Sequence, residues 1–226
     1  MIYWINLNRC KKRHDFMVSQ FNIYDLKNKR IPATEVGAIP ASFTNKFKLS
    51  KQEYGCMMSH RNAIKVAMSE YTDTRDWAVI MEDDTVVNGD VDFSAIVESA
   101  PKDWEILQLF MSFKPNVEKN ICTYISGTLW EPWELPNYGA AVYIINRKGC
   151  NKILSYNLNT CSYKQYADIY MYKEAKTYTC TYPLYYSNID CGSEIHPHHL
   201  LKHDIVMKCI KNIQETIGLP EEFRNI

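Results

Sequence analysis

The chain has no excess of charge of either sign, because 26 basic side chains balance 26 acidic ones among its 226 residues. Proteins that bind nucleic-acid backbones usually carry a basic excess, so general nucleic-acid binding is disfavoured. The sequence also lacks an apolar run near the roughly 20 residues that cross a bilayer, and its strongest runs, 77–81 and 140–145, have the length of strands. We therefore expect no nucleic-acid partner and no integral membrane segment.

Secretory and disulfide signatures are missing as well. The apolar start, residues 1–7, precedes the basic residues of 9–13, which reverses the order of a secretory signal. None of the eight cysteines has a CxxC or a Cys/His zinc spacing. These absences predict reduced, mostly buried thiols and a cytoplasmic location, with a disulfide framework as the alternative.

No repeat, low-complexity tract or Gly/Ser linker divides the chain, so residues 1–226 are expected to form one domain. Short β-rich runs alternate with stretches of helical periodicity. A capping box, Ser50 with Glu53, marks the start of the first long helix. This alternation predicts an α/β fold, a three-layer sandwich around a mostly parallel sheet. The expected strands are 2–7, 77–81, 104–109, 140–145 and 178–184, and the expected helices are 50–70, 147–156, 163–172 and 203–217.

Three adjacent carboxylates, Glu82, Asp83 and Asp84, follow directly after the apolar strand 77–81. In parallel α/β sheets, ligands bind beyond the carboxyl ends of the strands. Neighbouring carboxylates repel one another, and a hard divalent cation relieves that repulsion. On an extended backbone Glu82 and Asp84 point to one side and Asp83 to the other. The pattern favours a metal site on Glu82 and Asp84, and an acidic surface turn is the alternative.

Several blocks, in order from residue 2 to about residue 190, resemble glycosyltransferase family 25, which holds lipo-oligosaccharide and collagen galactosyl- and glucosyltransferases. They are residues 3–9 with Arg13, the Glu-x-Gly-Cys-x-x-Ser-His pattern of 53–60, residues 79–84, residues 139–147 with Gly149, Asp168, and the closing segment with Pro183 and 187–189. The stretch 111–136 matches none of them. The resemblance implies a GT-A-like fold, a nucleoside diphosphate sugar as donor, with UDP the first choice, and Mn²⁺ or Mg²⁺ as the metal.

The resemblance also implies a set of donor-binding residues. They are Asn6, Arg9, Arg13, Ser59, His60 and Asp83. A guanidinium at Arg9 or Arg13 suits a diphosphate or a nucleobase, while a solvated basic cluster is the alternative for Arg9. His60 is expected to orient the ribose or the acidic motif, not to act as the base. His196 and His198 are candidates for a late metal ligand, and a polar surface loop is their alternative.

The acceptor side is expected in the second half of the chain. Inversion in one step needs a carboxylate base near the acceptor hydroxyl, and Asp168 is the first choice for it. A helix-surface carboxylate or a ligand of a sugar hydroxyl is the alternative role of Asp168, and Glu134 is the reserve base. Three aromatic residues near Glu134 suit a sugar face or, equally, a packed loop stiffened by proline; they are Trp130, Trp133 and Tyr138.

The function expected from these residues and from the resemblance is a metal-dependent glycosyltransferase. It would move a hexose, galactose or glucose first, to an acceptor hydroxyl of a glycan or glycoprotein with inversion. Two alternatives belong to other classes. A metal-dependent phosphoesterase usually gathers acids and histidines from several strand ends, and only one strong acidic strand end is present. A non-catalytic carbohydrate-binding module would need no acidic triplet after a central strand.

Overall fold

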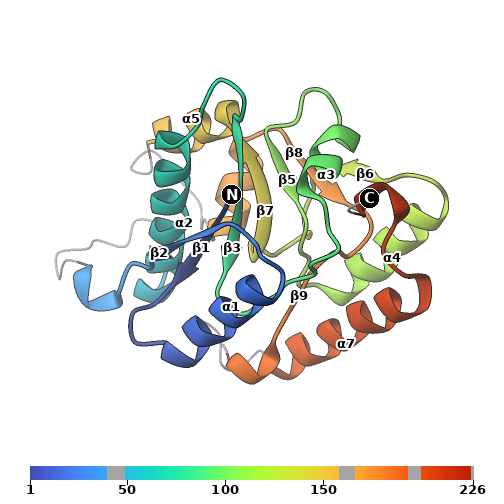
Figure 1. Ribbon diagram of the computed structural model, residues 1–226, viewed down its shortest axis with the longest axis horizontal. Coiled ribbons are helices and arrows are strands. Elements are labelled where there is room, and N and C mark those ends of the chain that lie inside the picture. The colour runs from blue at the N-terminus through green and yellow to red at the C-terminus, as the bar shows by residue number, and fades with distance from the viewer. Residues whose placement is uncertain (40–48, 158–165, 193–199, 225–226) are drawn as a thin grey trace.

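A computed structural model describes residues 1–39, 49–157, 166–192 and 200–224 (Figure 1). Among these residues the central sheet has seven strands in the order β2-β1-β3-β7-β5-β8-β6. The strands β7 and β6 run antiparallel to their neighbours and the other five run in one direction, so the expected mostly parallel sheet is confirmed. The bounds are β1 Ile2–Asn6, β2 Asn28–Pro32, β3 Trp77–Glu82, β5 Ile106–Gln108, β6 Trp130–Pro132, β7 Val142–Asn146 and β8 Thr177–Cys180.

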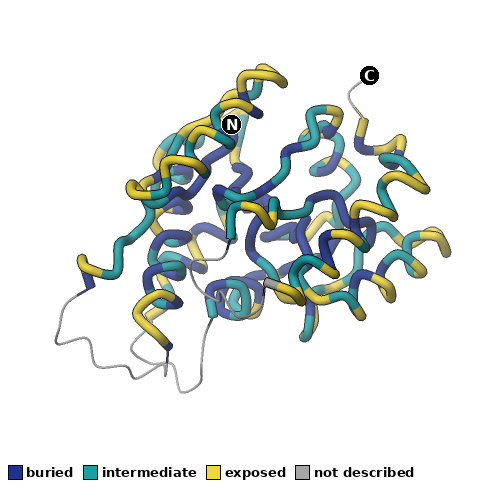
Figure 2. Tube along the Cα trace, turned by 90° about the horizontal axis from the view of Figure 1, so that it is seen from below, coloured by how far each residue is buried: buried dark blue, intermediate teal, exposed yellow. Residues whose placement is uncertain are grey.

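Helices cover both faces of this sheet, because side chains that alternate along each strand enter two separate cores. Along β3, Val79 and Met81 join the core under α1, α3, α4 and α7, whereas Ala78 and Ile80 join the core under α2, α5 and α6. Figure 2 shows the buried segments enclosed between helices that are exposed along their outer sides. The three-layer sandwich is thereby confirmed. The helices are α1 Lys11–Ile23, α2 Lys51–Ser69, α3 Phe93–Ser99, α4 Lys114–Ile125, α5 Arg147–Ser155, α6 Ala167–Glu174 and α7 Leu200–Ile217.

The long helix α2 begins at the capping box that the sequence indicated. The Glu53 backbone N–H donates to Ser50 Oγ over 3.1 Å, and the Ser50 N–H donates to Glu53 Oε2 over 2.6 Å. Two backbone donors that a helix start leaves unpaired are thus satisfied. The cap thus defines the start of α2 at Lys51. None of the helices in the described ranges is both long and apolar enough to cross a bilayer.

The carboxyl end of β3 is the place where distant segments converge. Because β7 is antiparallel to β3, the start of β7 lies beside the carboxyl end of β3. The Glu82 N–H donates to the Ala141 carbonyl over 2.8 Å. Just beyond, β4 (Thr85–Val86) pairs with β9 (Tyr186–Ser187) in a small second sheet. The Asn188 N–H donates to the Asp84 carbonyl over 2.7 Å. The acidic motif is therefore held on both sides by backbone from the second half of the chain.

Several elements were not expected from the sequence, among them α1, β2 and α4. A solvated basic cluster is only the alternative considered for Arg9 and its neighbours; in the structure these basic residues lead into α1, where Met17, Gln20 and Phe21 are buried. The expected helix 163–172 is described from Ala167 onward, and its first residues lie outside the described ranges.

Candidate active site

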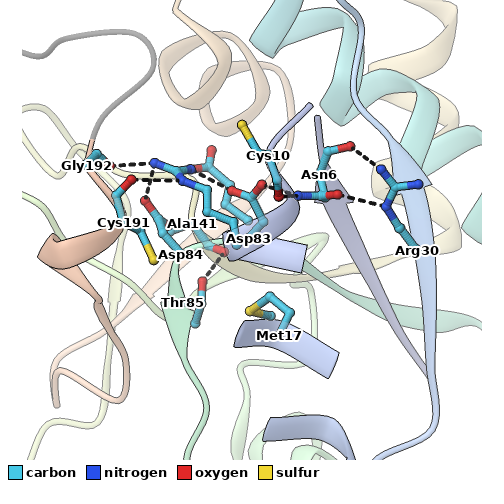
Figure 3. Close-up of polar contacts among 12 residues, drawn as sticks. Asn6, Cys10, Met17, Arg30, Asp83, Asp84, Thr85, Ala141, Cys191 and Gly192 are labelled. Atoms are coloured by element: carbon cyan, nitrogen blue, oxygen red, sulfur yellow. Dashed lines mark hydrogen bonds and ion pairs between the residues drawn. The ribbon is translucent and has the colours of Figure 1, made fainter. Parts of the chain in front are cut away.

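Both carboxylate oxygens of Asp83 accept hydrogen bonds from the N-terminal segment, as Figure 3 shows. Its Oδ2 accepts a hydrogen bond from Asn6 Nδ2 over 2.6 Å, and its Oδ1 accepts one from Arg13 Nη1 over 2.6 Å. Asn6 is oriented in turn by Arg30, whose Nε donates to Asn6 Oδ1 over 2.8 Å. Burial raises the pKa of Asp83 above its ordinary value, although Arg13 and Asn6 oppose that shift. With both oxygens occupied, Asp83 positions Arg13 and Asn6.

The neighbouring carboxylate, Asp84, differs from Asp83 in its hydrogen bonding. Its Oδ1 is buried and has no hydrogen-bond partner in the described part of the chain. Its Oδ2 lies 3.8 Å from Arg13 Nη2. Burial raises the pKa of Asp84 to about 7, and the negative charge of Glu82 adds to the shift. A buried carboxylate oxygen without a partner is costly, and a bound cation is one of the few groups that satisfy it.

Glu82 ends β3 and meets a histidine from α2. Its Oε1 lies 3.0 Å from His60 Nε2, while His60 Nδ1 lies 3.2 Å from the Tyr143 hydroxyl on β7. Burial alone would raise the pKa of Glu82, but the hydrogen bond and charge of His60, together with Arg13, lower it below its ordinary value. His60 is buried and contacts the first acid of the motif.

Arg13 joins the acidic motif to the last third of the chain. Its Nε donates to the Cys191 carbonyl over 3.3 Å and its Nη2 to the Gly192 carbonyl. Gly192 has a φ of 71°, a left-handed conformation that favours glycine. Arg13 therefore bridges Asp83, Asp84 and the end of the turn η3 (Ile189–Cys191).

A first cleft of about 130 Å³ gathers every donor or metal residue expected from the sequence that lies in the described ranges. Arg9 stands at its exposed side and pairs with Glu35. Ser59 is buried, donates to the Gly55 carbonyl over 2.7 Å and accepts from the Thr34 N–H over 2.8 Å. The expected residues that line this cleft are Asn6, Arg9, Arg13, Ser59, His60, Glu82, Asp83 and Asp84.

A second, larger cleft of about 610 Å³ adjoins the first, since Cys56 and Glu82 line both. Asp168, near the start of α6, lines this second cleft, and its Oδ2 accepts from the Gly139 N–H over 2.8 Å. Gly139 has a φ of 118°, and a Cβ there would lie 2.7 Å from the Phe110 ring, so only glycine fits. Burial raises the pKa of Asp168. A half-buried carboxylate, Asp168, thus lines the same cleft as Glu82, the first acid of the motif.

Phe113 and Tyr138 form an exposed aromatic pair at the second cleft. Their ring centroids lie 6.3 Å apart in an edge-to-face arrangement, and the residues are 39% and 37% exposed. Phe113 was missed in the sequence because it belongs to the stretch that resembled no family block. The two tryptophans considered with Tyr138 pack elsewhere: Trp130 Nε1 donates to Ser99 Oγ, and Trp133 lies against Tyr172.

Three residues expected at the site are not placed in these clefts. The Glu134 side chain is 72% exposed, and its Oε1 lies 3.5 Å from Lys119 Nζ. His196 and His198 lie outside the described residues. Arg30 and Tyr143 were missed as supporting residues, although Tyr143 could have been found because alternate residues of its strand face α2.

The structure is a mostly parallel α/β sandwich whose acidic strand end borders two joined clefts, a GT-A-like arrangement. Glycosyltransferase family 25 (LPS biosynthesis protein) matches residues 1–171, and the chain belongs to this family. The family resemblance noted in the sequence is thereby confirmed. No curated protein matches the chain in sequence.

Solved structures that match the chain share little sequence with it. The STIV protein A197 is 12% identical over 84% of this chain and 86% of that chain, with a TM-score of 0.47. A glycosyltransferase involved in the glycosylation of the major capsid of PBCV-1 is 10% identical over 73% and 70%, with a TM-score of 0.38. A mutant of Drosophila β-1,4-galactosyltransferase 7, in complex with manganese, UDP-Gal and xylobiose, is 11% identical over 66% and 49%, with a TM-score of 0.30. The assignment of the chain rests on the family match.

Proposed function

We propose that this glycosyltransferase moves a hexose, galactose or glucose, from a UDP-linked donor to an acceptor hydroxyl of a glycan or glycoprotein. The proposal includes dependence on Mn²⁺ or Mg²⁺ and inversion at the anomeric carbon. The observation that carries it is the buried Oδ1 of Asp84, which has no hydrogen-bond partner among the described residues and lines the first cleft together with Glu82.

The residues of the first cleft fit a hard divalent cation. Asp84 Oδ1 needs a positive partner, and the Glu82 charge that raises the pKa of Asp84 is relieved by the same ion. Asp84 and Glu82 would hold the metal, and a histidine of the segment 193–199, His196 or His198, remains the proposed further ligand. When bound, the cation supplies positive charge that stabilises the leaving diphosphate.

The arginines of the first cleft suit the rest of the donor. Arg13 is held rigidly by Asp83 and by the Gly192 carbonyl, so its position needs no reorganisation when an anion binds. Arg9 is the more exposed of the two and can exchange Glu35 for a phosphate oxygen. Asn6 and Ser59 line the same cleft and would contact the nucleoside.

The second cleft suits the acceptor. Asp168 would take the proton of the acceptor hydroxyl as that oxygen attacks the anomeric carbon, and its raised pKa makes it a better base than an exposed carboxylate. Phe113 and Tyr138 offer apolar ring faces for an acceptor sugar. Because Cys56 and Glu82 border both clefts, the transferred hexose would lie at their junction, between donor and acceptor. Glu134 faces Lys119 at the surface, so the proposal gives the base to Asp168.

The experiment is UDP release from UDP-galactose and UDP-glucose, with and without Mn²⁺ and with a panel of saccharide acceptors. We expect release that needs Mn²⁺, rises with one acceptor class and vanishes in Asp84→Asn. The matched control is Asp90→Asn, an exposed acid outside both clefts. Tight sugar binding without release would indicate a binding module, and release of a phosphate monoester would indicate a phosphoesterase. Either result would overturn the proposal.

A further inference from the structure

A second group of metal-ligating side chains lies beside the acidic motif. The proposed donor site does not use its three members together. Cys56 and His60 stand one helical turn apart on α2, and Glu82 reaches them from the end of β3. One ligand atom from each of the three residues, the Cys56 sulfur, a His60 ring nitrogen and a Glu82 oxygen, lies within 4.8 Å of the other two. The three side chains come from two rigid elements, so their mutual placement is set by the fold.

The chemistry of this group differs from that of the acidic motif. A thiolate, an imidazole and a carboxylate together are typical ligands of Zn²⁺, whereas Mn²⁺ and Mg²⁺ favour sites rich in oxygen and do not select a thiolate. His60 Nε2 and Glu82 Oε1 lie 3.0 Å apart. Two ligands bound to one tetrahedral Zn²⁺ are separated by about 3.3 Å, as Zn–N and Zn–O distances near 2.0 Å require. These two atoms can therefore bind one ion with little movement.

The surroundings of His60 also match those of a metal-binding histidine. A ligating imidazole usually uses its other ring nitrogen for a hydrogen bond that fixes the ring. His60 Nδ1 has such a partner in the Tyr143 hydroxyl at 3.2 Å. His60 is buried. Cys56 and Glu82 line both clefts, so one side of the group borders open space that a small molecule can reach. The group has the form of a three-ligand site with an open position.

We propose that Cys56, His60 and Glu82 form a second metal site, which binds Zn²⁺ or another thiophilic divalent cation and shares Glu82 with the donor site. Binding expels the Cys56 thiol proton to solvent, because only the thiolate is a ligand. Occupation of this site withdraws Glu82 from the cation at Asp84. Zn²⁺ and Mn²⁺ therefore compete for the protein. The binding of Zn²⁺ stands on the geometry alone, and the competition rests on the proposed function.

Binding is tested with Co²⁺ as a spectroscopic substitute for Zn²⁺, on the full chain without nucleotide. We expect a thiolate-to-cobalt charge-transfer band that Zn²⁺ abolishes by displacement. Cys56→Ser should lose the band and bind Zn²⁺ about a hundredfold more weakly, since loss of a ligand costs at least as much as loss of an outer-shell partner. Cys122→Ser, which changes an exposed cysteine on α4, should keep both the charge-transfer band and the affinity for Zn²⁺. A wild-type complex without the band, or a band that persists in Cys56→Ser, would overturn the site.

Competition is tested by electron paramagnetic resonance of Mn²⁺. Zn²⁺ should release bound Mn²⁺ from the wild type and leave it bound in Cys56→Ser. Retention of Mn²⁺ by the zinc-loaded wild type would overturn the sharing of Glu82. A chain that binds no Mn²⁺ at all, yet shows the cobalt band, would instead contradict the proposed function and leave the zinc site standing. Asp84→Asn provides the matched variant, because it should lose Mn²⁺ and keep the band.

Discussion

At the scale of single residues, two adjacent carboxylates have opposite tasks. Asp83 has both oxygens paired, with Asn6 and Arg13, whereas one buried oxygen of Asp84 has no partner within the described part of the chain. A buried charge with good partners stabilises the fold. A buried charge without them is unfavourable until a ligand of opposite charge binds to it. Both residues lie in the turn between β3 and β4, and Arg13 meets both of them, so the difference lies in the partners that each carboxylate oxygen reaches.

Substitution of each acid should separate these tasks. Asp83→Asn leaves the buried Arg13 charge with weaker partners and should lower the free energy of unfolding by about 3 kcal/mol, the usual cost of breaking such a pair. Asp84→Asn should leave the metal-free stability equal or higher and abolish Mn²⁺-dependent UDP binding. Chemical denaturation and calorimetry measure the two effects. Equal stability losses in both variants would contradict this division.

The two candidate bases can be compared directly. Asp168→Asn retains an oxygen that can accept the Gly139 N–H but cannot take a proton, so kcat should fall by about a hundredfold or more. UDP affinity should stay within the error of calorimetry, because the first cleft is untouched. Glu134→Gln is the matched control and should leave kcat unchanged, since that carboxylate faces Lys119 at the surface. The reverse outcome would move the base to Glu134.

The pH dependence of kcat follows from the same carboxylate. Burial raises the pKa of Asp168 above 3.8, so its protonated fraction at a given acidic pH is larger than that of an exposed aspartate. A base works only when deprotonated, and kcat at saturating Mn²⁺, donor and acceptor should therefore fall as the pH is lowered, by about tenfold per unit below that pKa. Steady-state rates from pH 8 downward measure it. A kcat that is level down to about pH 4, the ordinary carboxyl range, would exclude Asp168.

At the scale of elements, the aromatic residues divide into a packed set and an exposed pair. Trp133 lies edge-to-face on Tyr172 and its Nε1 donates to the Asn137 carbonyl over 2.8 Å, so it stiffens the loop. Phe113 precedes α4 as its N-cap residue and meets Tyr138 at the second cleft. The loop and the start of α4 thus present two rings to the space where the acceptor is proposed.

Truncation of these rings should affect the acceptor alone. Phe113→Ala or Tyr138→Ala should raise the acceptor KM by about tenfold, which corresponds to about 1.4 kcal/mol of lost contact. UDP affinity should be unaffected. Ile125→Ala, which truncates an exposed apolar side chain at the far end of α4, is the control for general surface effects. An unchanged KM in both aromatic variants would place the acceptor elsewhere.

The elements that could be predicted from the sequence are those whose own residues determine them. The buried runs of β1, β3 and β7 and the capping box of α2 each carry a local signal, and all are confirmed. The strand β2 carries almost none, because only Ile31 of its five residues is buried and its place comes from pairing with β1. The helix α1 was concealed by its charged start. Its buried side holds Met17, Gln20 and Phe21, too narrow a stripe to stand out.

At the scale of the whole molecule, the site could be predicted only as a list of residues, not as an assembly. The family resemblance named the residues of the first cleft, yet their partners come from positions that no local pattern links. Asn6 meets Asp83 across 77 positions, and Arg13 meets the Gly192 carbonyl across 179. Such pairs depend on the sheet order. The sequence indicated which strands exist but not that β7 lies between β3 and β5.

The thiols provide a test of the whole chain. The cysteines in the described ranges are all free, and Cys161 lies outside them. Titration of the denatured, unreduced protein should find close to eight thiols, because none of the cysteines has a spacing typical of a disulfide framework. Mass spectrometry after alkylation checks the count residue by residue. A count near zero would overturn both the prediction of reduced thiols and the cytoplasmic location expected with it.

The bridge that Arg13 makes to the carbonyls of Cys191 and Gly192 has a consequence for synthesis on the ribosome. A chain is made from its N-terminus, so β1, α1 and β3 leave the exit tunnel long before residue 192. Arg13 and Asp83 can pair early, but the strand β9 and the turn η3 that complete their surroundings are made much later. The region that matches the family ends at residue 171, short of these partners. A nascent chain therefore carries all the acids of the motif for much of its synthesis before it can enclose them.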